Sequence, residues 1–159
     1  MTVLCACAAA SPPALAQGAR DRLREIVQDE CLPNWRGAGD PSPCASVTLL
    51  DGTSLPSGFA VLADRKGGAH FLLIPTRTVT GIESPEARRP GEPNYFAAAW
   101  AARAVLAHAL GFTPPPGAVG LALNHEDARS QDQLHIHISC LRASVSAALQ
   151  AQAAQIGPR

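Results

Sequence analysis

The segment 133–140 alternates polar and apolar side chains in the pattern of a half-buried β-strand. Successive side chains of a strand point to opposite faces of the sheet. His135, His137 and Ser139 therefore share one face of this predicted strand. The other face carries the residues expected in the core: Ile136, Ile138 and Cys140. We predict Cys140 to be a small buried strand residue, because that is the commoner role of a lone thiol.

The polar face of this strand admits three interpretations. Two histidines at alternate positions can begin a metal site, which would need a further ligand from His70, His108, His125 or an acid. The face can be solvated and without a role. One imidazole can also be a nucleophile that its neighbours orient. The strand alone leaves all three open, and we expect His70 and His108 to be structural.

Periodicity and turn residues predict the rest of the fold. The run 58–63 and the run 70–74 are β-like and flank a Gly-containing turn, which indicates a hairpin. Two further strands are predicted at 47–50 and 119–123. The segment 76–93 is loop-like. Together with the predicted helices, these strands indicate a single α+β domain with an antiparallel sheet.

Three helices are predicted around the sheet. A short amphipathic helix covers 20–30 and leads into a Pro/Gly-rich loop that holds two cysteines. Asn94 caps one long helix that ends at Gly111. Its core stripe is expected on one face: Phe96, Trp100 and Ala107. A weak alanine-rich helix is predicted over 144–154.

The first residues resemble a secretory signal. Residues 2–10 are small or apolar, and Ala14-Leu15-Ala16 has the form of a cleavage site, so we expect a signal over 1–16 and the mature domain over 17–159. A lipoprotein box ending at Cys7 and a plain alanine-rich terminus are the alternatives. No apolar run reaches the roughly 20 residues that span a bilayer as a helix.

Export bears on Cys31 and Cys44, which flank the Pro/Gly-rich loop. A disulfide between them would stabilise this loop by about 3 kcal/mol through the entropy of the unfolded chain. The alternative is two reduced cysteines in a cytosolic protein, and we favour the bridge if the chain is exported.

Composition excludes several functions. The 159 residues include 13 basic and 13 acidic side chains, so the chain lacks the basic excess that a nucleic-acid binder needs. A hydrophobic content of 47% with 16% charged residues also excludes a disordered chain.

The residues upstream of the histidine strand narrow the interpretation. Asn124, Gln131 and His135 are spaced as in the histidine-triad (HIT) superfamily of nucleotide hydrolases and transferases, and the pattern resembles that signature. Ser139 replaces the third histidine of the triad. Arg129 lies in the same turn, where a guanidinium suits phosphate oxygens. We expect the neighbouring segment 125–127 to be a solvated turn.

One subfamily accommodates the serine. Six segments together resemble the bacterial CDP-diacylglycerol pyrophosphatases: 31–34, 40–44, 73–76, 81–85, 129–131 and 135–140. The resemblance covers about residues 26–142. It implies a HIT-like fold and a hydrolase that converts CDP-diacylglycerol to CMP and phosphatidate at the periplasmic face of the inner membrane.

The resemblance also implies the roles of the site residues. His137 would attack the cytidylyl phosphorus and form a nucleotidyl-histidine. His135 would contact phosphate or set the tautomer of His137, Gln131 would donate to a phosphate oxygen, and Asn124 would fix the nucleotide or the imidazole. The remaining partners of the substrate are Ser139 and Arg129. No metal and no cofactor is expected.

The resemblance leaves other points open. Family members extend beyond the motif, so we expect this chain to be shortened at the C-terminus. A soluble nucleotide pyrophosphate is the alternative substrate, and a non-catalytic nucleotide-binding domain is the alternative function. The sequence pattern also leaves open whether the chain forms a homodimer.

Overall fold

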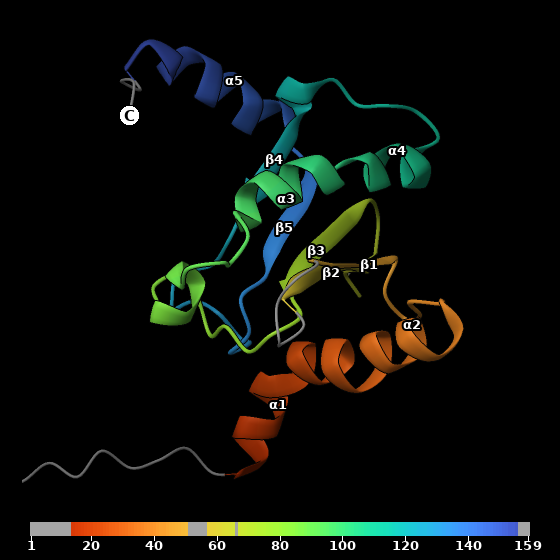
Figure 1. Cartoon of the computed structure of the whole chain (residues 1–159). Coiled ribbons are helices and arrows are strands. Elements are labelled where there is room, and N and C mark those ends of the chain that lie inside the picture. Colours follow the sequence, from red (N-terminus) through yellow and green to blue (C-terminus); the bar gives the residue numbers. More distant parts are fainter. Residues whose placement is uncertain (1–13, 51–56, 66, 156–159) are drawn as a thin grey trace, which may run out of the picture.

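The centre of the molecule is an antiparallel sheet with the strand order β1-β2-β3-β5-β4. Figure 1 shows the computed structural model, which describes residues 14–50, 57–65 and 67–155. The five strands of this part are β1 (Ser46–Leu49), β2 (Gly58–Ala63), β3 (His70–Pro75), β4 (Val119–Ala122) and β5 (Ile136–Cys140). The predicted α+β class is confirmed, and so are the predicted strands and the β2–β3 hairpin.

Helices cover both faces of the sheet (Figure 1). One face is covered by a continuous helical segment made of α1 (Ala14–Glu25), a π-helical turn η1 (Ile26–Cys31) and α2 (Leu32–Ala38). The other face is covered by α3 (Tyr95–Ala102) and α4 (Ala104–Leu110). The last helix is α5 (Ala143–Gln152), as predicted. Short 3₁₀ turns occupy Pro85–Arg88, Pro116–Ala118 and Ala153–Gln155.

Each covered face has its own core. The core under α3 and α4 is built around fully buried aliphatic residues, among them Leu73, Ile136 and Ile138. The core under the N-terminal helices includes Leu62, Leu72 and the cysteine pair. Because strand side chains alternate, the face opposite Ile136 and Ile138 is the face toward α1. The pairing register of β5 with β3 and β4 then determines which side chains can reach His137 on this face of the sheet.

The helix after Asn94 differs in part from the prediction. The Asn94 side chain accepts a hydrogen bond from the Ala97 amide at 3.0 Å, and Gly111 ends α4 with φ of 75°, so both predicted ends are confirmed. The helix is interrupted at Arg103 and is therefore two helices. The predicted core stripe is wrong, because Phe96 and Trp100 are 40% and 37% exposed. The residues that face the core are Tyr95, Ala99 and Leu106.

Two further predictions about the cysteine segments are wrong. Leu32–Ala38 is helical rather than a loop, because Pro33 lies in the first turn, where a missing backbone N–H is tolerated. Cys140 is exposed rather than buried, and it is the last residue of β5. The predicted bridge between Cys31 and Cys44 is present.

Removal of this disulfide is expected to destabilise the protein. The bridge closes a loop with a sequence separation of 13, and both cysteines are buried in the core under the N-terminal helices. Loss of the cross-link restores conformational freedom to the unfolded chain. The double variant Cys31→Ser/Cys44→Ser should lower the free energy of unfolding by about 3 kcal/mol in urea titrations. Cys140→Ser is the matched control, and an equal loss in that variant would contradict the prediction.

The predicted signal falls mostly on residues 1–13, which lie outside the described residues, and α1 begins at Ala14. Within the described part of the chain, none of the helices has the length and apolar character needed to cross a bilayer.

Candidate active site

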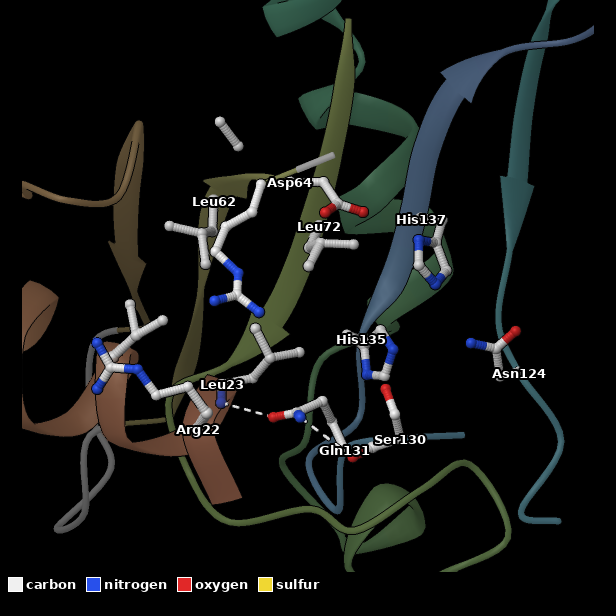
Figure 2. Close-up of a pocket in the computed structure, with 13 residues that line it drawn as sticks. Arg22, Leu23, Leu62, Asp64, Leu72, Asn124, Ser130, Gln131, His135 and His137 are labelled. Carbon is white, nitrogen blue, oxygen red and sulfur yellow. Dashed lines mark hydrogen bonds between the residues drawn. The ribbon is translucent and has the colours of Figure 1, made fainter. Parts of the chain in front are cut away.

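The polar face of β5 opens into a cleft beneath α1 (Figure 2). His135 and His137 lie side by side at this cleft, and their ring centroids are 5.1 Å apart. Asn124, which follows β4, lies across from them. The cleft has a volume of about 190 Å³. Gln131 also lines the cleft, so the structure brings four of the sequence-predicted site residues together.

The remaining walls come from segments that the sequence motif does not include. Leu23 and Ile26 of the N-terminal helical segment form an apolar wall. Leu62 and Leu72 continue this wall from the sheet. Two guanidinium-bearing residues, Arg22 and Arg65, also line the cleft. The site thus combines imidazoles, an apolar wall and positive charge. Of these three features, the sequence motif around the histidines contains only the imidazoles.

His70, which we expected to be structural, contacts His137 from the neighbouring strand. In the β3–β5 register, His70 lies opposite Ser139, and Leu72 lies opposite His137. Residues diagonal to one another on the same sheet face are within reach of long side chains. The His70 Nε2 is 2.9 Å from the His137 Nδ1. The other ring nitrogen of His70, Nδ1, is 3.2 Å from an Asp64 carboxylate oxygen.

These three residues also offer ligand atoms that lie within 4.8 Å of one another. A single ion would use one ring nitrogen of His70 and leave the other for a different partner. The structure instead uses both nitrogens of His70, one toward Asp64 and one toward His137. Without an ion, the three side chains form a hydrogen-bonded chain, although their donor atoms are close enough to one another to share an ion.

His135 is held by a backbone group of the residues that precede β5. It is 7% exposed, and its Nδ1 is 2.7 Å from the Gln133 carbonyl oxygen. Because a carbonyl oxygen only accepts, the His135 proton lies on Nδ1 in this contact, and Nε2 carries the lone pair. Gln133 itself is fully buried. The position of His135 therefore depends on a buried amide two residues before it.

Gln131 holds α1 in place. Its amide nitrogen donates to the Ala19 carbonyl oxygen at 2.7 Å, and its amide oxygen accepts from the Leu23 N–H at 3.0 Å. Ala19 and Leu23 are four residues apart, so they are the two groups that an α-helical hydrogen bond would join. The side-chain amide therefore bridges one step of the helix ladder at the edge of the cleft, and Figure 2 shows its bond to Leu23.

Arg129 belongs to a charge network beside the cleft. Its guanidinium contacts Glu83 at 2.5 Å and Asp132 at 3.3 Å, and its side chain is 11% exposed. Asp132 also accepts two hydrogen bonds of 2.7 Å from Arg20 of α1. Gly81 permits this packing, because a Cβ there would lie 2.2 Å from the Arg129 guanidinium. The network joins α1 to the turn before β5.

The Arg20 hydrogen bonds hold the pKa of Asp132 below its usual range, and the Arg129 contact adds to this. A carboxyl with a lowered folded pKa binds fewer protons when folded than when unfolded. Its stabilisation is therefore complete above the ordinary Asp pKa of about 3.9 and is lost as the pH falls through the lower folded value.

Asp132→Asn is expected to lower the free energy of unfolding by about 1 kcal/mol at neutral pH. The difference from the wild type should shrink as the pH falls below about 4. Thermal unfolding between neutral pH and pH 2 measures this. Asp29→Asn, an exposed change on η1, is the control. A difference that grows toward acid pH would contradict the assignment.

The remaining predicted site residues are placed as follows. Ser139 is half-buried on β5 opposite His70 and is not among the residues that line the cleft. His125 is exposed in its turn and lies near Asp127, which agrees with the predicted solvated turn. His108 is exposed on α4.

Together the fold and the site define an α+β protein with a histidine-lined cleft on one face of its sheet. The family model of CDP-diacylglycerol pyrophosphatase matches residues 18–159, and the chain belongs to this family. A CDP-diacylglycerol pyrophosphatase from Yersinia pestis is 46% identical over 134 residues, which are 84% of this chain and 50% of that protein. The chain therefore spans about half the length of this curated relative.

Among solved structures, a HIT family hydrolase from Clostridium thermocellum matches 82% of this chain and 96% of its own, with 15% identity and a TM-score of 0.43. The family resemblance predicted from the sequence segments is confirmed by the family match and by the Yersinia relative.

Proposed function

We propose that this chain hydrolyses the pyrophosphate bond of CDP-diacylglycerol and releases CMP and phosphatidate. The observation that carries the proposal is the pair of imidazoles, His135 and His137, that face one cleft in a member of this family. The similarity to the CDP-diacylglycerol pyrophosphatase of Yersinia pestis supports the substrate class. A phosphoanhydride has a good leaving group, so the protein has mainly to position the substrate and stabilise phosphoryl charge.

In the proposed reaction, the His137 Nε2 lone pair attacks the cytidylyl phosphorus. A bond from nitrogen to phosphorus forms, and the bond from that phosphorus to the bridging oxygen breaks. Phosphatidate leaves with the bridging oxygen and its electron pair. Water then attacks the same phosphorus, the phosphorus–nitrogen bond breaks, and CMP leaves with the oxygen of the water. His137 returns to its neutral state.

The other residues support this reaction by position. His135 has two possible roles, which differ in its protonation. A protonated His135 would donate from Nε2 to the phosphate, and a neutral His135 would accept a proton from the attacking water at Nε2. Asn124 fixes the nucleotide. Gln131 donates to a phosphate oxygen when it exchanges its bond to Ala19, and Arg129 offsets phosphate charge from beside the cleft. We assign Ser139 a weaker supporting position opposite His70.

The test compares two substrates. The purified chain is incubated with CDP-diacylglycerol in detergent micelles and, separately, with CDP-glycerol, both with and without a chelator. We expect CMP from the lipid substrate at the higher kcat/KM and no effect of the chelator. Faster turnover of CDP-glycerol would favour the soluble-substrate alternative, loss of turnover in chelator would favour a metal site, and no CMP from either would favour a binding domain.

We also propose that the chain is exported and acts at the periplasmic face of the inner membrane. The Cys31–Cys44 disulfide supports an oxidising compartment, and the apolar residues 2–10 support export. Mass spectrometry of the chain isolated from cells would show cleavage after Ala16. A mature chain that keeps residue 1 and two free thiols would contradict this placement.

A further inference from the structure

His70 links a carboxylate to the proposed nucleophile. Its Nδ1 is 3.2 Å from Asp64, and its Nε2 is 2.9 Å from the His137 Nδ1. The two imidazole rings have centroids 5.0 Å apart. All three side chains are partly buried. Asp64 directly follows β2, His70 is the first residue of β3, and His137 lies in β5, so three segments at neighbouring strands contribute one residue each.

The chemistry of these groups fixes where the protons lie when both rings are neutral. An ionised carboxylate only accepts hydrogen bonds, so the His70 proton lies on Nδ1, toward Asp64. The His70 Nε2 then carries a lone pair and must accept. The partner that donates to it is the His137 Nδ1–H. A neutral imidazole has a single N–H, so the lone pair of His137 lies on Nε2.

We propose that Asp64 and His70 are positioning residues that hold the proton of His137 on Nδ1 and thereby keep Nε2 as the attacking nitrogen. This inference rests on the proposed role of His137 as the nucleophile. Ser139 stands where the triad pattern has a third histidine, and His70 lies opposite it on the adjacent strand. A second imidazole is thus brought to His137 across the sheet rather than along β5.

The opposite tautomer of His137, with its proton on Nε2, would be inactive. The hydrogen bonds from Asp64 through His70 to His137 therefore matter for the reaction. If Asp64 were neutral or replaced by a group that can donate, His70 could carry its proton on Nε2. The His137 Nδ1 would then accept, its proton would move to Nε2, and the attacking lone pair would be lost. A carboxylate at position 64 disfavours this state because it has no proton to donate.

The tautomer of His137 can be measured without any assay of activity. In the full chain labelled with ¹⁵N, long-range ¹H–¹⁵N spectra distinguish Nδ1–H from Nε2–H imidazoles. We expect His137 to be protonated at Nδ1 in the wild type and to shift toward Nε2–H in Asp64→Asn. Asp127→Asn is the matched control, because Asp127 lies near His125 in an exposed pair. A wild-type His137 protonated at Nε2 would overturn the proposal, whatever the variants do.

Kinetics give the second test. Asp64→Asn is expected to lower kcat about 100-fold with little change in KM, because the side chain acts through His70 on the attacking nitrogen. His70→Gln should give a similar loss. The double variant should be no slower than His70→Gln alone, because both changes break the same chain. Losses that multiply in the double variant, or an unchanged kcat in Asp64→Asn, would overturn the proposal.

The two tests separate this proposal from the function on which it rests. A wild-type chain that releases no CMP contradicts the proposed function and leaves the tautomer measurement to be decided on its own. An active wild type with His137 protonated at Nε2 contradicts the positioning role alone. If circular dichroism shows that Asp64→Asn does not fold, the wild-type spectrum and His70→Gln decide the question.

Discussion

Replacement of His137 by alanine is expected to lower CMP release from CDP-diacylglycerol by on the order of 10⁴-fold or more, because the attacking atom is removed. His137 lies at the cleft with Nδ1 bound to His70, and Nε2 is the nitrogen that we propose to attack phosphorus. His135 is held at Nδ1 by the Gln133 carbonyl and is proposed to contact the phosphate rather than to attack it. Initial rates of CMP release measure the loss.

The fold should survive this substitution. His137 is only half-buried, and the core side of β5 is formed by Ile136 and Ile138. Circular dichroism and the melting temperature check this point. His125→Ala is the matched control, because its side chain is 71% exposed in the turn before β5. Turnover within about tenfold of the wild type in His137→Ala would contradict the nucleophile assignment.

Exchange of Gln133 for leucine is expected to lower the free energy of unfolding by about 4 kcal/mol, because three backbone groups lose a buried partner. The amide nitrogen donates to the carbonyl oxygens of Pro75 and Arg77 at 3.0 and 2.7 Å. The amide oxygen accepts from the Val79 N–H at 3.3 Å. Leucine fills a similar volume and can make none of these bonds, so the penalty is that of unsatisfied groups rather than that of a cavity.

Urea titrations measure this effect. Gln150→Leu is the control, because Gln150 is exposed on α5 and its side-chain amide donates to the Ser146 hydroxyl at 3.4 Å. We expect the control to change the free energy of unfolding by less than about 0.5 kcal/mol. A loss below about 1 kcal/mol in Gln133→Leu would contradict the role of this amide as the link between the segment after β3 and the entrance to β5.

The features predicted well from sequence are those that local chemistry determines. Asn94 and Gly111 mark helix ends by their own side chain and backbone, and the β2–β3 hairpin follows from a Gly-containing turn. The alternation around Ile136 assigned the core face of β5 correctly. Each of these signals is read within a few residues, so no tertiary contact is needed to interpret it.

The errors arise where a choice depends on what packs nearby. Phe96 and Trp100 are large and apolar, but the sheet contacts the opposite face of α3 through Ala99. Cys140 follows the alternation of β5, yet it is the last residue of the strand and is exposed. Hydrophobicity alone did not distinguish a covered face from an uncovered one, because coverage is set by the neighbouring elements.

Only part of the candidate site could be predicted from the sequence, because the rest depends on which strands pair. Alternation along the predicted strand identified His135, which directly precedes β5, and His137, which lies in it. His70 and His137 meet only because β3 pairs with β5, and they are separated by 67 residues in the sequence. Asp64 reaches the site through the turn of the hairpin. The available signal was that His70 lies at the start of a predicted strand. Its partner His137 could not be identified without the order of the strands in the sheet.

The central claim is that CDP-diacylglycerol is cleaved by attack at its cytidylyl phosphorus, the atom to which His137 is proposed to bond. Turnover of this substrate by the purified full chain in H₂¹⁸O, followed by mass spectrometry of both products, tests it most directly. Water attacks the phosphorus that histidine has captured, so we predict one ¹⁸O in CMP and none in phosphatidate. Label in phosphatidate, or the absence of both products, would contradict the account.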